Sequence, residues 1–396
     1  MRPIYLDNNA TTRTDPSVVA AMLPFFSEQF GNASSSHAFG SDVAPALKQA
    51  RRSLQALIGA AFDHEIVFTS GGTESDNTAI LSALAVQEGR DEIVTTAVEH
   101  PAVLSLVEEL ARRGIKSHLV PVDTRSRLDI EAFRRALSPR TAVASVMWAN
   151  NETGTIFPVE FLAKMARSAG ALFHTDAVQA VGRVPIDLKN TEIDMLSLSS
   201  HKLHGPKGIG ALYVRKGTKF KPLVVGGPQE RRRRAGTENT PGIVGLGTAA
   251  ELAAAQSEQA RMQISGLRDR LEQGVLRLGH CMVLGDVRSR LPNTSNIAFE
   301  QLEGEAIIHH LNRAGIAASL GSACASGSME PSHVLRAMNV PPSALRGAIR
   351  FSLSRETTAD EIDHVLQALP DIIAKLRALS PSWQERATSR PTEMIS

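Results

Sequence analysis

The segment DMLSLSSHKLHGPKGIG, residues 194–210, joins a short apolar run to a polar, glycine-rich continuation. Its first part, residues 195–198, predicts a buried strand, and two lysines follow it, Lys202 and Lys207. Burial and neighbouring cations lower the pKa of a lysine, and its neutral amine is then a nucleophile that can form a Schiff base with an aldehyde. In the alternative interpretation both lysines lie on a solvated loop, and this segment alone does not decide between the two interpretations or the two lysines.

Short apolar strands alternate with helices around this segment. The predicted strands are 66–69, 92–96, 117–122, 142–147, 172–175, 195–199 and 211–214. The predicted helices are 15–30, 41–58, 73–84, 102–113, 130–137 and 159–168, and the polar segment 31–40 has no regular period. This alternation is typical of an α/β fold with a largely parallel sheet flanked by helices.

A chain of 396 residues exceeds the usual limit for one hydrophobic core, so we predict two domains. The larger α/β domain is expected over residues 15–255. The Ala-rich stretch 240–278 predicts a helical link to a smaller α/β domain, made of residues 1–14 and 256–380, and residues 381–396 form a polar tail. Within the smaller domain we expect strands at 282–284 and 295–299 and helices at 305–314, 331–338 and 361–378.

The composition is that of an ordinary soluble globular protein, and the net charge of +2 gives no reason to expect a nucleic-acid or membrane partner. The basic run at Arg231 to Arg234 is typical of a solvated face, and we assign it no role. The chain has two cysteines, Cys281 and Cys324, which exclude a disulfide framework and fit a reducing compartment. The N-terminus has no apolar signal core and no stretch reaches a membrane-spanning length, so a cytoplasmic protein is expected.

Polar residues follow most of the predicted strands. In open α/β sheets ligands bind beyond the carboxyl ends of the strands, so these residues are expected to meet at one edge. They are SGGTESDN (70–77), His100, NNETG (150–154), Asp176 with Gln179, and Ser199 with His201 and Lys202. Each alone has an ordinary structural explanation, such as a tight turn, a structural histidine, or a buried carboxylate paired with an arginine. Together they provide a phosphate-binding helix start, a histidine, a carboxylate and a lysine, which are the groups that pyridoxal phosphate requires.

The two cysteines lie in different surroundings. Cys324 lies in GSACASGS (321–328), and this composition predicts a mobile loop with an exposed, reactive thiol. Cys281 opens an apolar run and is expected in the core. Further on, Arg350 in RFSLSRETT (350–358) has the geometry to bind a carboxylate in bidentate fashion, unless it forms a surface ion pair.

The motifs together resemble those of the cysteine desulfurases, within the class V aminotransferase group of fold-type I pyridoxal-phosphate enzymes. The matching segments are YLDNNATT, TSGGTES, EHPAV, NNETG, HTDAVQA, SSHKLHGPKG, RRAGTEN, GSACASG, EPSHVL and RFSLSRETT. They run from about residue 5 to 365 in the family's order. The short cysteine loop is similar to that of the NifS/IscS-like group rather than the selenocysteine-lyase-like group.

The resemblance implies a role for each residue. Lys202 forms the Schiff base, Cys324 accepts the sulfur, and His100 stacks on the cofactor ring and moves protons. The other implied cofactor and substrate contacts are Asp176 with the pyridine nitrogen, Gln179 with the phenolic oxygen, Gly72, Thr73, Ser199, Ser200 and His201 with the phosphate, Thr237 from the partner subunit, and Asn151 with Arg350 at the substrate carboxylate. Ser200 departs from the family, which often has Gly or Ala there.

The implied activity is the pyridoxal-phosphate-dependent conversion of L-cysteine to L-alanine, with a persulfide formed on Cys324. The sulfur is expected to go to an iron–sulfur scaffold protein, either for nitrogenase metalloclusters or for general cluster assembly, and the enzyme is expected to be a homodimer. No intrinsic metal site is expected, although Cys324 is a candidate transient iron–sulfur ligand. The alternatives are a housekeeping desulfurase, a selenocysteine lyase, another class V aminotransferase, and a non-enzymatic cluster scaffold.

Overall fold

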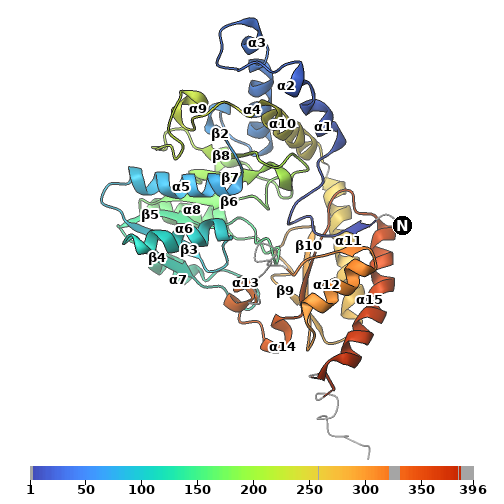
Figure 1. Ribbon diagram of the computed structural model, residues 1–396. Helices are drawn as coiled ribbons and strands as arrows, with labels where there is room; N and C mark the ends of the chain where they lie inside the picture. Colours follow the sequence, from blue (N-terminus) through green and yellow to red (C-terminus); the bar gives the residue numbers. More distant parts are fainter. Residues whose placement is uncertain (1–2, 257, 321–330, 382, 385–396) are drawn as a thin grey trace, which may run out of the picture.

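A seven-stranded sheet forms the centre of the molecule in the computed structural model, which describes residues 3–256, 258–320, 331–381 and 383–384 (Figure 1). The strand order is β2-β8-β7-β6-β5-β3-β4. The strands are β2 (Ile66–Thr69), β3 (Glu92–Thr96), β4 (Lys116–Val120), β5 (Thr141–Ser145), β6 (Leu172–Asp176), β7 (Met195–Ser199) and β8 (Gly210–Val214). Only β8 runs antiparallel to its neighbours in this sheet, so the predicted α/β fold with a largely parallel sheet is confirmed.

Helices cover both faces of this sheet, and the alternation of side chains along each strand explains how. Val67, Ile93 and Met195 face one apolar cluster, whereas the next residues along the chain in β3 and β7, Val94 and Leu196, face another. The first face carries α5 (Gly72–Val86) and α6 (Pro101–Arg112). The second face carries α4 (Ala44–Leu57), α7 (Ile130–Ala136), α8 (Val159–Ser168) and α10 (Thr240–Ala254).

The N-terminal helices differ from the predicted single helix over 15–30. Asp15 caps the first helix, because its side chain accepts the backbone N–H of Ser17 at 2.8 Å. Pro24 has no N–H to continue the helical hydrogen bonds, so the chain divides there. The resulting elements are α1 (Pro16–Met22) and α2 (Pro24–Ser27), and a short α3 (Ala38–Ser41) starts inside the segment predicted to be irregular.

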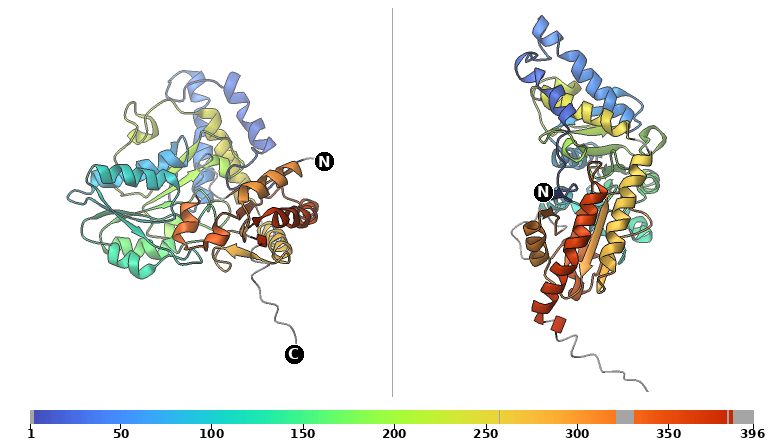
Figure 2. Two further views of the ribbon diagram at one scale, coloured as in Figure 1. Left: turned by 60° about the horizontal axis from the view of Figure 1, so that its bottom comes forward. Right: turned by 90° about the vertical axis from the view of Figure 1, so that its right-hand side faces the viewer.

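A second, antiparallel sheet of order β12-β10-β9 lies beside the C-terminal helices (Figure 2). Its strands are β9 (Cys281–Leu284), β10 (Thr294–Phe299) and β12 (Ala348–Ser352), and the helices packed with it are α11 (Glu258–Leu276), α12 (Gly304–Arg313) and α15 (Ala359–Leu379). The sequence did not predict β12, because Arg350 interrupts its apolar pattern although the residue is only 1% exposed. The remaining helices are short, namely α9 (Gln229–Arg232), α13 (His333–Ala337) and α14 (Pro342–Leu345).

The predicted helical stretch 240–278 is two helices, α10 and α11, and α10 ends at Ala254. The largest apolar core also contains Leu284, Leu291 and Val334, which come after this link. The two predicted domains therefore share packing, and the boundary between residues 255 and 256 stays a prediction. None of the helices in the described ranges is both long and apolar enough to cross a membrane.

The N-terminal segment joins the two sheets. Strand β1 (Ile4–Tyr5) pairs in parallel with β11 (Ile316–Ala317), and Asp7 then forms a bridge with Ser352 of β12. From there the chain runs along the loop after β7, where the backbone N–H of Thr12 donates to the carbonyl of His201 at 2.9 Å. Residues 4–12 thus reach from the second sheet to the carboxyl end of the first.

Candidate active site

A cavity of about 390 Å³ lies beyond the carboxyl ends of the parallel strands. Segments that follow β2, β3, β5, β6 and β7 line it, together with the N-terminal segment, β12 and α13. The predicted site residues in its wall are Gly72, Thr73, His100, Asn151, Asp176, Gln179, Ser199, His201, Lys202 and Arg350. Three of the residues assigned by resemblance are elsewhere: Ser200 is buried outside the cavity wall, Thr237 is exposed, and Cys324 lies outside the described residues.

The geometry separates the two lysines that the sequence left open. After β7 the chain makes one 3₁₀ turn, Ser200–Lys202, which brings Lys202 into the cavity. Its Nζ donates to the backbone carbonyls of Asn9 at 2.5 Å and Ala10 at 2.7 Å. Lys207 is exposed and does not line this cavity.

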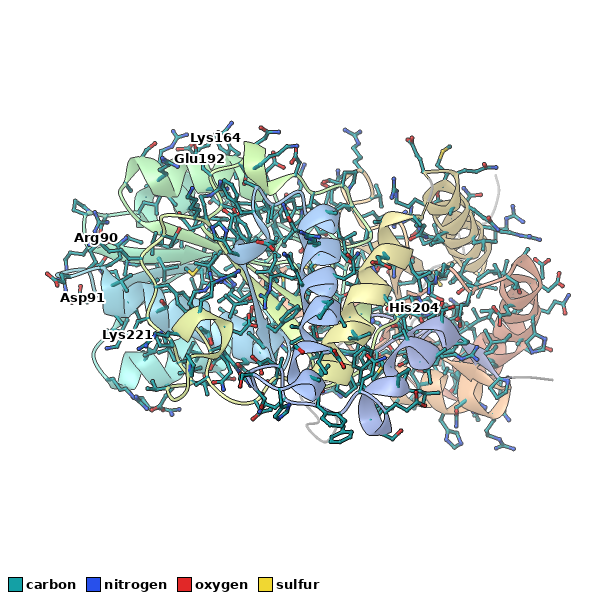
Figure 3. The ribbon with its side chains drawn as sticks, turned by 90° about the horizontal axis from the view of Figure 1, so that it is seen from above. Arg90, Asp91, Lys164, Glu192, His204 and Lys221 are labelled. Carbon is teal, nitrogen blue, oxygen red and sulfur yellow. The ribbon has the colours of Figure 1, made fainter. Side chains whose placement is uncertain are left out.

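The loop after Lys202 is fixed by the N-terminal segment. His204 Nδ1 lies 3.0 Å from the carbonyl oxygen of Arg13, and the backbone N–H of His204 donates to Thr12 Oγ1 at 2.8 Å. In Figure 3, His204 lies beside the first helix, far from the charged residues Arg90 and Asp91 at the outer end of the large sheet. Burial, followed by the charge of Arg355, lowers the pKa of His204 to about 4, so this histidine is neutral at physiological pH.

Asp176 places a carboxylate at the tip of β6. The side chain is 6% exposed and accepts the backbone N–H of Val178 at 2.9 Å. Burial raises the pKa of Asp176, and the charges of His100 and Lys202 oppose this shift. A buried carboxylate in this position requires a cationic or N–H partner within the cavity.

Two further buried acids surround Asp176, and the sequence did not single out either. Asp76 on α5 has a pKa well above the usual range because of burial and then the charge of Asp176. Its Oδ1 has no hydrogen bond to any described residue and lies 3.6 Å from His174 Nε2. Burial raises the pKa of Glu99 to about 8, although the backbone N–H of Met147 and Thr96 Oγ1 donate to its carboxylate. Burial therefore favours the neutral, protonated forms of Asp76 and Glu99 beside Asp176.

The opposite side of the cavity is suited to an anion. The first turn of α5 presents backbone N–H groups that have no partner within the helix, and its dipole favours negative charge. A Cβ on Gly72 would lie 2.8 Å from Val178 Cγ2, so only glycine fits where α5 approaches the chain after β6. His201 lies nearby with Nδ1 3.1 Å from Thr11 Oγ1, and burial together with the charge of Lys202 lowers its pKa to about 4.

Arg350 is buried, which excludes the alternative of a surface ion pair. Its guanidinium donates to Asp7 Oδ1 at 2.7 Å and to the carbonyl of Asn151 at 3.0 Å. Gln179 is also fixed in orientation, because Arg183 donates to its Oε1 while its Nε2 donates to the Asn9 carbonyl at 2.9 Å. Both side chains are therefore held before any ligand binds.

Several residues of the wall were assigned no role in the sequence analysis. Asp76 and Glu152 lie within the strand-end segments 70–77 and 150–154, but neither was given a function. Asn9 and Ala10 lie in a segment predicted only as a loop, and His333 lies at the start of α13. A strand-end search does not find these last three residues, since none of them follows a strand of the large sheet. Within the described ranges no cluster of His, Cys, Asp and Glu has the arrangement of a metal site.

The model of the aminotransferase class-V family matches residues 4–365, so the chain belongs to that family. Within it, the chain belongs with the cysteine desulfurases, as the sequence motifs predicted. It is 70% identical over 387 residues to a cysteine desulfurase of Bradyrhizobium diazoefficiens, covering 98% of both chains. It is 60% identical over 384 residues to the cysteine desulfurase NifS of Azotobacter vinelandii, covering 97% of this chain and 96% of the relative. A solved NifS-like protein superposes with a TM-score of 0.89 at 37% identity, covering 94% of this chain and 100% of that one.

Proposed function

We propose that this protein is a pyridoxal-phosphate-dependent cysteine desulfurase that converts L-cysteine to L-alanine and collects the sulfur as a persulfide on Cys324. The observation that carries the proposal is the meeting of Lys202, Asp176 and the glycine start of α5 in one cavity, in a chain of this family. The sulfur would supply iron–sulfur cluster assembly, and a NifS among the relatives supports nitrogenase metalloclusters as its destination.

The residues of the cavity fit pyridoxal phosphate. The phosphate would be held by Gly72, Thr73, Ser199 and His201. The carboxylate of Asp176 would pair with the protonated nitrogen of the cofactor ring. The burial of Asp176 supports this assignment, because a buried carboxylate requires a cationic or N–H partner. When bound, the cofactor supplies an aldehyde for Schiff-base chemistry and a ring that takes up the electron pair left at the substrate Cα.

The other side chains of the cavity wall would bind the substrate, move its proton and orient the cofactor. Arg350 would bind the substrate carboxylate together with Asn151, and its contact with Asp7 holds the guanidinium in place for this. Lys202 Nζ would move the proton at the substrate Cα once it leaves the carbonyls of Asn9 and Ala10. Gln179 would donate from Nε2 to the cofactor's phenolic oxygen, for which Arg183 fixes the orientation of its amide.

The sulfur transfer is assigned to Cys324 by resemblance. Its thiolate would attack the substrate sulfur, so that an S–S bond forms while the bond between the substrate Cβ and sulfur breaks. His100 lies at the start of α6 in the cavity wall, where it can donate a proton to the carbon skeleton that becomes alanine.

We also propose a cytoplasmic homodimer that passes sulfur to an iron–sulfur scaffold protein. Large apolar side chains on the N-terminal helices and the segment after them support a partner surface, namely Leu23, Phe26, Phe30 and Phe39, which are 58–64% exposed. Thr237 is exposed on the loop after α9, which is compatible with a contribution to a second subunit's cofactor site.

Borohydride reduction followed by peptide mapping tests the cofactor attachment. We expect a pyridoxyl adduct on Lys202, loss of the adduct in Lys202→Ala, and retention in the matched control Lys207→Ala. Recovery of the adduct on another lysine would contradict the assignment.

Sulfide and alanine release from L-cysteine tests the reaction. We expect Cys324→Ala to keep the visible absorbance of the bound cofactor and to lose sulfide release, because the nucleophile is missing. Cys281→Ala is the matched control and should keep both. Full sulfide release by Cys324→Ala would favour a different class V reaction.

A further inference from the structure

Two histidines line the cavity from the starts of two helices, and their hydrogen bonds occupy opposite ring nitrogens of the same tautomer, the one with its proton on Nε2. His100 caps α6, and its Nδ1 accepts the backbone N–H of Ala102 at 3.1 Å. A backbone N–H can only donate, so Nδ1 carries the lone pair and the neutral ring has its proton on Nε2. In this arrangement His100 donates a proton, but its ring has no second lone pair with which to accept one.

His333 has the opposite arrangement at the start of α13. Its Nε2 lies 2.9 Å from the carbonyl oxygen of Glu99, and a carbonyl oxygen can only accept. Nε2 therefore carries the proton, and the neutral ring has its lone pair on Nδ1. No residue in the described part of the chain hydrogen-bonds to Nδ1, and the side chain is half-buried in the cavity wall. His333 is thus prepared to accept a proton at Nδ1.

The start of α13 is firmly attached to the cavity wall. Ser332 Oγ accepts the backbone N–H groups of Val334 at 3.1 Å and Leu335 at 3.3 Å, so its own hydrogen is available to donate. It donates to Glu152 Oε2 at 2.6 Å. Together with the contact to Glu99, this bond fixes the position of the imidazole before substrate arrives.

Charged groups of both signs surround His333 in the cavity. Titratable and charged groups reach this part of the cavity from every neighbouring element, namely Asp76, Glu99, His100, Glu152, Asp176, His201, Lys202 and Arg350, with Arg336 on α13 itself. Burial raises the pKa of Glu152, and the charges of His333 and Arg350 act in the opposite direction. Glu152 and His333 therefore attract each other, and an imidazolium at His333 gains a carboxylate neighbour.

We propose that Nδ1 of His333 accepts the proton that the ammonium group of incoming L-cysteine must lose before its nitrogen becomes a nucleophile. In this step an N–H bond of the substrate ammonium breaks, the electron pair stays on the nitrogen, and the proton moves to Nδ1. The proposal rests on the proposed desulfurase function. It assigns opposite directions of transfer to the two histidines, with His333 accepting and His100 donating.

The substitution His333→Gln separates proton transfer from anchoring. The glutamine amide reaches the position of Nε2 and keeps an N–H for the Glu99 carbonyl, but it has no titratable nitrogen. We expect kcat/KM for L-cysteine near pH 7 to fall by about 100-fold, which is the lower end of the range for removal of a general base. The loss should shrink as the pH rises, because free L-cysteine then arrives with a neutral amine. The Tm and the absorbance of the bound cofactor should be unchanged.

Two controls test the reason for such a loss. The inhibition constant of 3-mercaptopropionate, which has no ammonium group, should be the same for wild type and His333→Gln. His333→Asn also lacks a titratable nitrogen and in addition lacks the reach to the Glu99 carbonyl, so its difference from His333→Gln reports on anchoring. A second variant, Glu152→Gln, keeps an acceptor for Ser332 but removes the negative charge. Because an imidazolium at His333 then has no carboxylate neighbour, the acid limb of the kcat/KM profile should move to lower pH.

Some outcomes overturn the inference. Wild-type kcat/KM and pH profile in His333→Gln, with a defect only in His333→Asn, would reduce His333 to an anchor. An unshifted acid limb in Glu152→Gln would also contradict proton acceptance at His333. A wild-type enzyme that releases neither sulfide nor alanine from L-cysteine would instead overturn the proposed function, so the two failures are distinguishable.

Discussion

Asn9 connects more parts of the site than any residue that the sequence analysis singled out. Its Nδ2 donates to Thr294 Oγ1 at 2.9 Å and to the Asn151 carbonyl at 3.1 Å, and its Oδ1 accepts from Asn293 Nδ2 at 3.1 Å. Its own carbonyl accepts from Gln179 and Lys202. One residue, 1% exposed, therefore holds the second sheet and the loop after β5 through its side chain and Lys202 through its backbone carbonyl.

Replacing Asn9 with alanine should lower the free energy of unfolding by about 2–4 kcal/mol, because it leaves buried partners such as Asn293 without their hydrogen bonds. Chemical denaturation of the two proteins measures this difference. Asn190→Ala is the matched control, since that side chain is exposed and bonds only to Asp187, and it should change stability by less than about 0.5 kcal/mol. Equal losses in the two variants would contradict the role of Asn9.

At the residue scale the sequence identified the side chains that directly follow a parallel strand, because one topological rule applies to all of them. Asp176 and Lys202 are of this kind. The rule does not find Asn9 or His333, since their position depends on the path of the N-terminal segment and the docking of α13. Spacing in the sequence carries no information on these tertiary relations.

The prediction of strands and helices is limited in the same way, because sequence patterns carry no information on tertiary contacts. Strands β2, β3 and β7 have the predicted bounds because each is a short, fully buried run that contains adjacent large apolar residues. Strand β12 was missed because Arg350 stands in its centre, and its burial follows from the ion pair with Asp7, more than three hundred residues away. Local pattern finds an element when burial is local, and it fails when a distant partner makes burial of a charge possible.

The glycine start of α5 gives a prediction for an element. Alanine at Gly72 brings a Cβ to within 2.8 Å of Val178 Cγ2, so the chain after β6 must move away from the helix start. Such overpacking costs about 1–3 kcal/mol, and if it falls on the phosphate end of the site the dissociation constant of pyridoxal phosphate rises roughly 5- to 100-fold. Titration of the apoprotein with the cofactor measures this change.

Gly266 supplies the control for this prediction. It lies exposed within α11, and a Cβ there would meet nothing within 4 Å. Gly266→Ala should therefore raise the free energy of unfolding by about 0.5–1 kcal/mol and leave cofactor affinity unchanged. An unchanged dissociation constant in Gly72→Ala would show that the helix start does not hold the phosphate.

At the scale of the whole molecule, buried acids and histidines connect stability to pH. Glu99 titrates near pH 8 in the folded protein and near 4.5 when unfolded, so the unfolded chain binds fewer protons between these values and stability falls as the pH rises. His174 has its pKa lowered by burial to about 3, so the unfolded chain binds more protons below 6.5 and stability falls as the pH drops. Between pH 4.5 and 6.5 the two effects oppose each other.

The substitution Glu99→Gln tests the loss of stability at rising pH separately from the effect of His174. The stability of this variant relative to wild type should rise with pH between about 4.5 and 8, by at most about 1.4 kcal/mol per pH unit. Urea denaturation at pH 5, 6.5 and 8 measures the trend. Glu160→Gln, on the exposed first turn of α8, should give a difference that does not vary with pH. Parallel curves for wild type and Glu99→Gln would contradict a raised pKa at Glu99.

The N-terminal segment has a consequence for the order of synthesis. Residues 4–8 leave the ribosome more than three hundred residues before their partners Ile316, Ala317 and Ser352. Until those partners emerge, the segment that places the carbonyls of Asn9 and Ala10 beside Lys202 is attached only to the large sheet, through contacts such as that of Thr12 with His201. A growing chain therefore carries an unfinished site, and the ribosome's arrival at β12 sets the time at which the lysine is positioned.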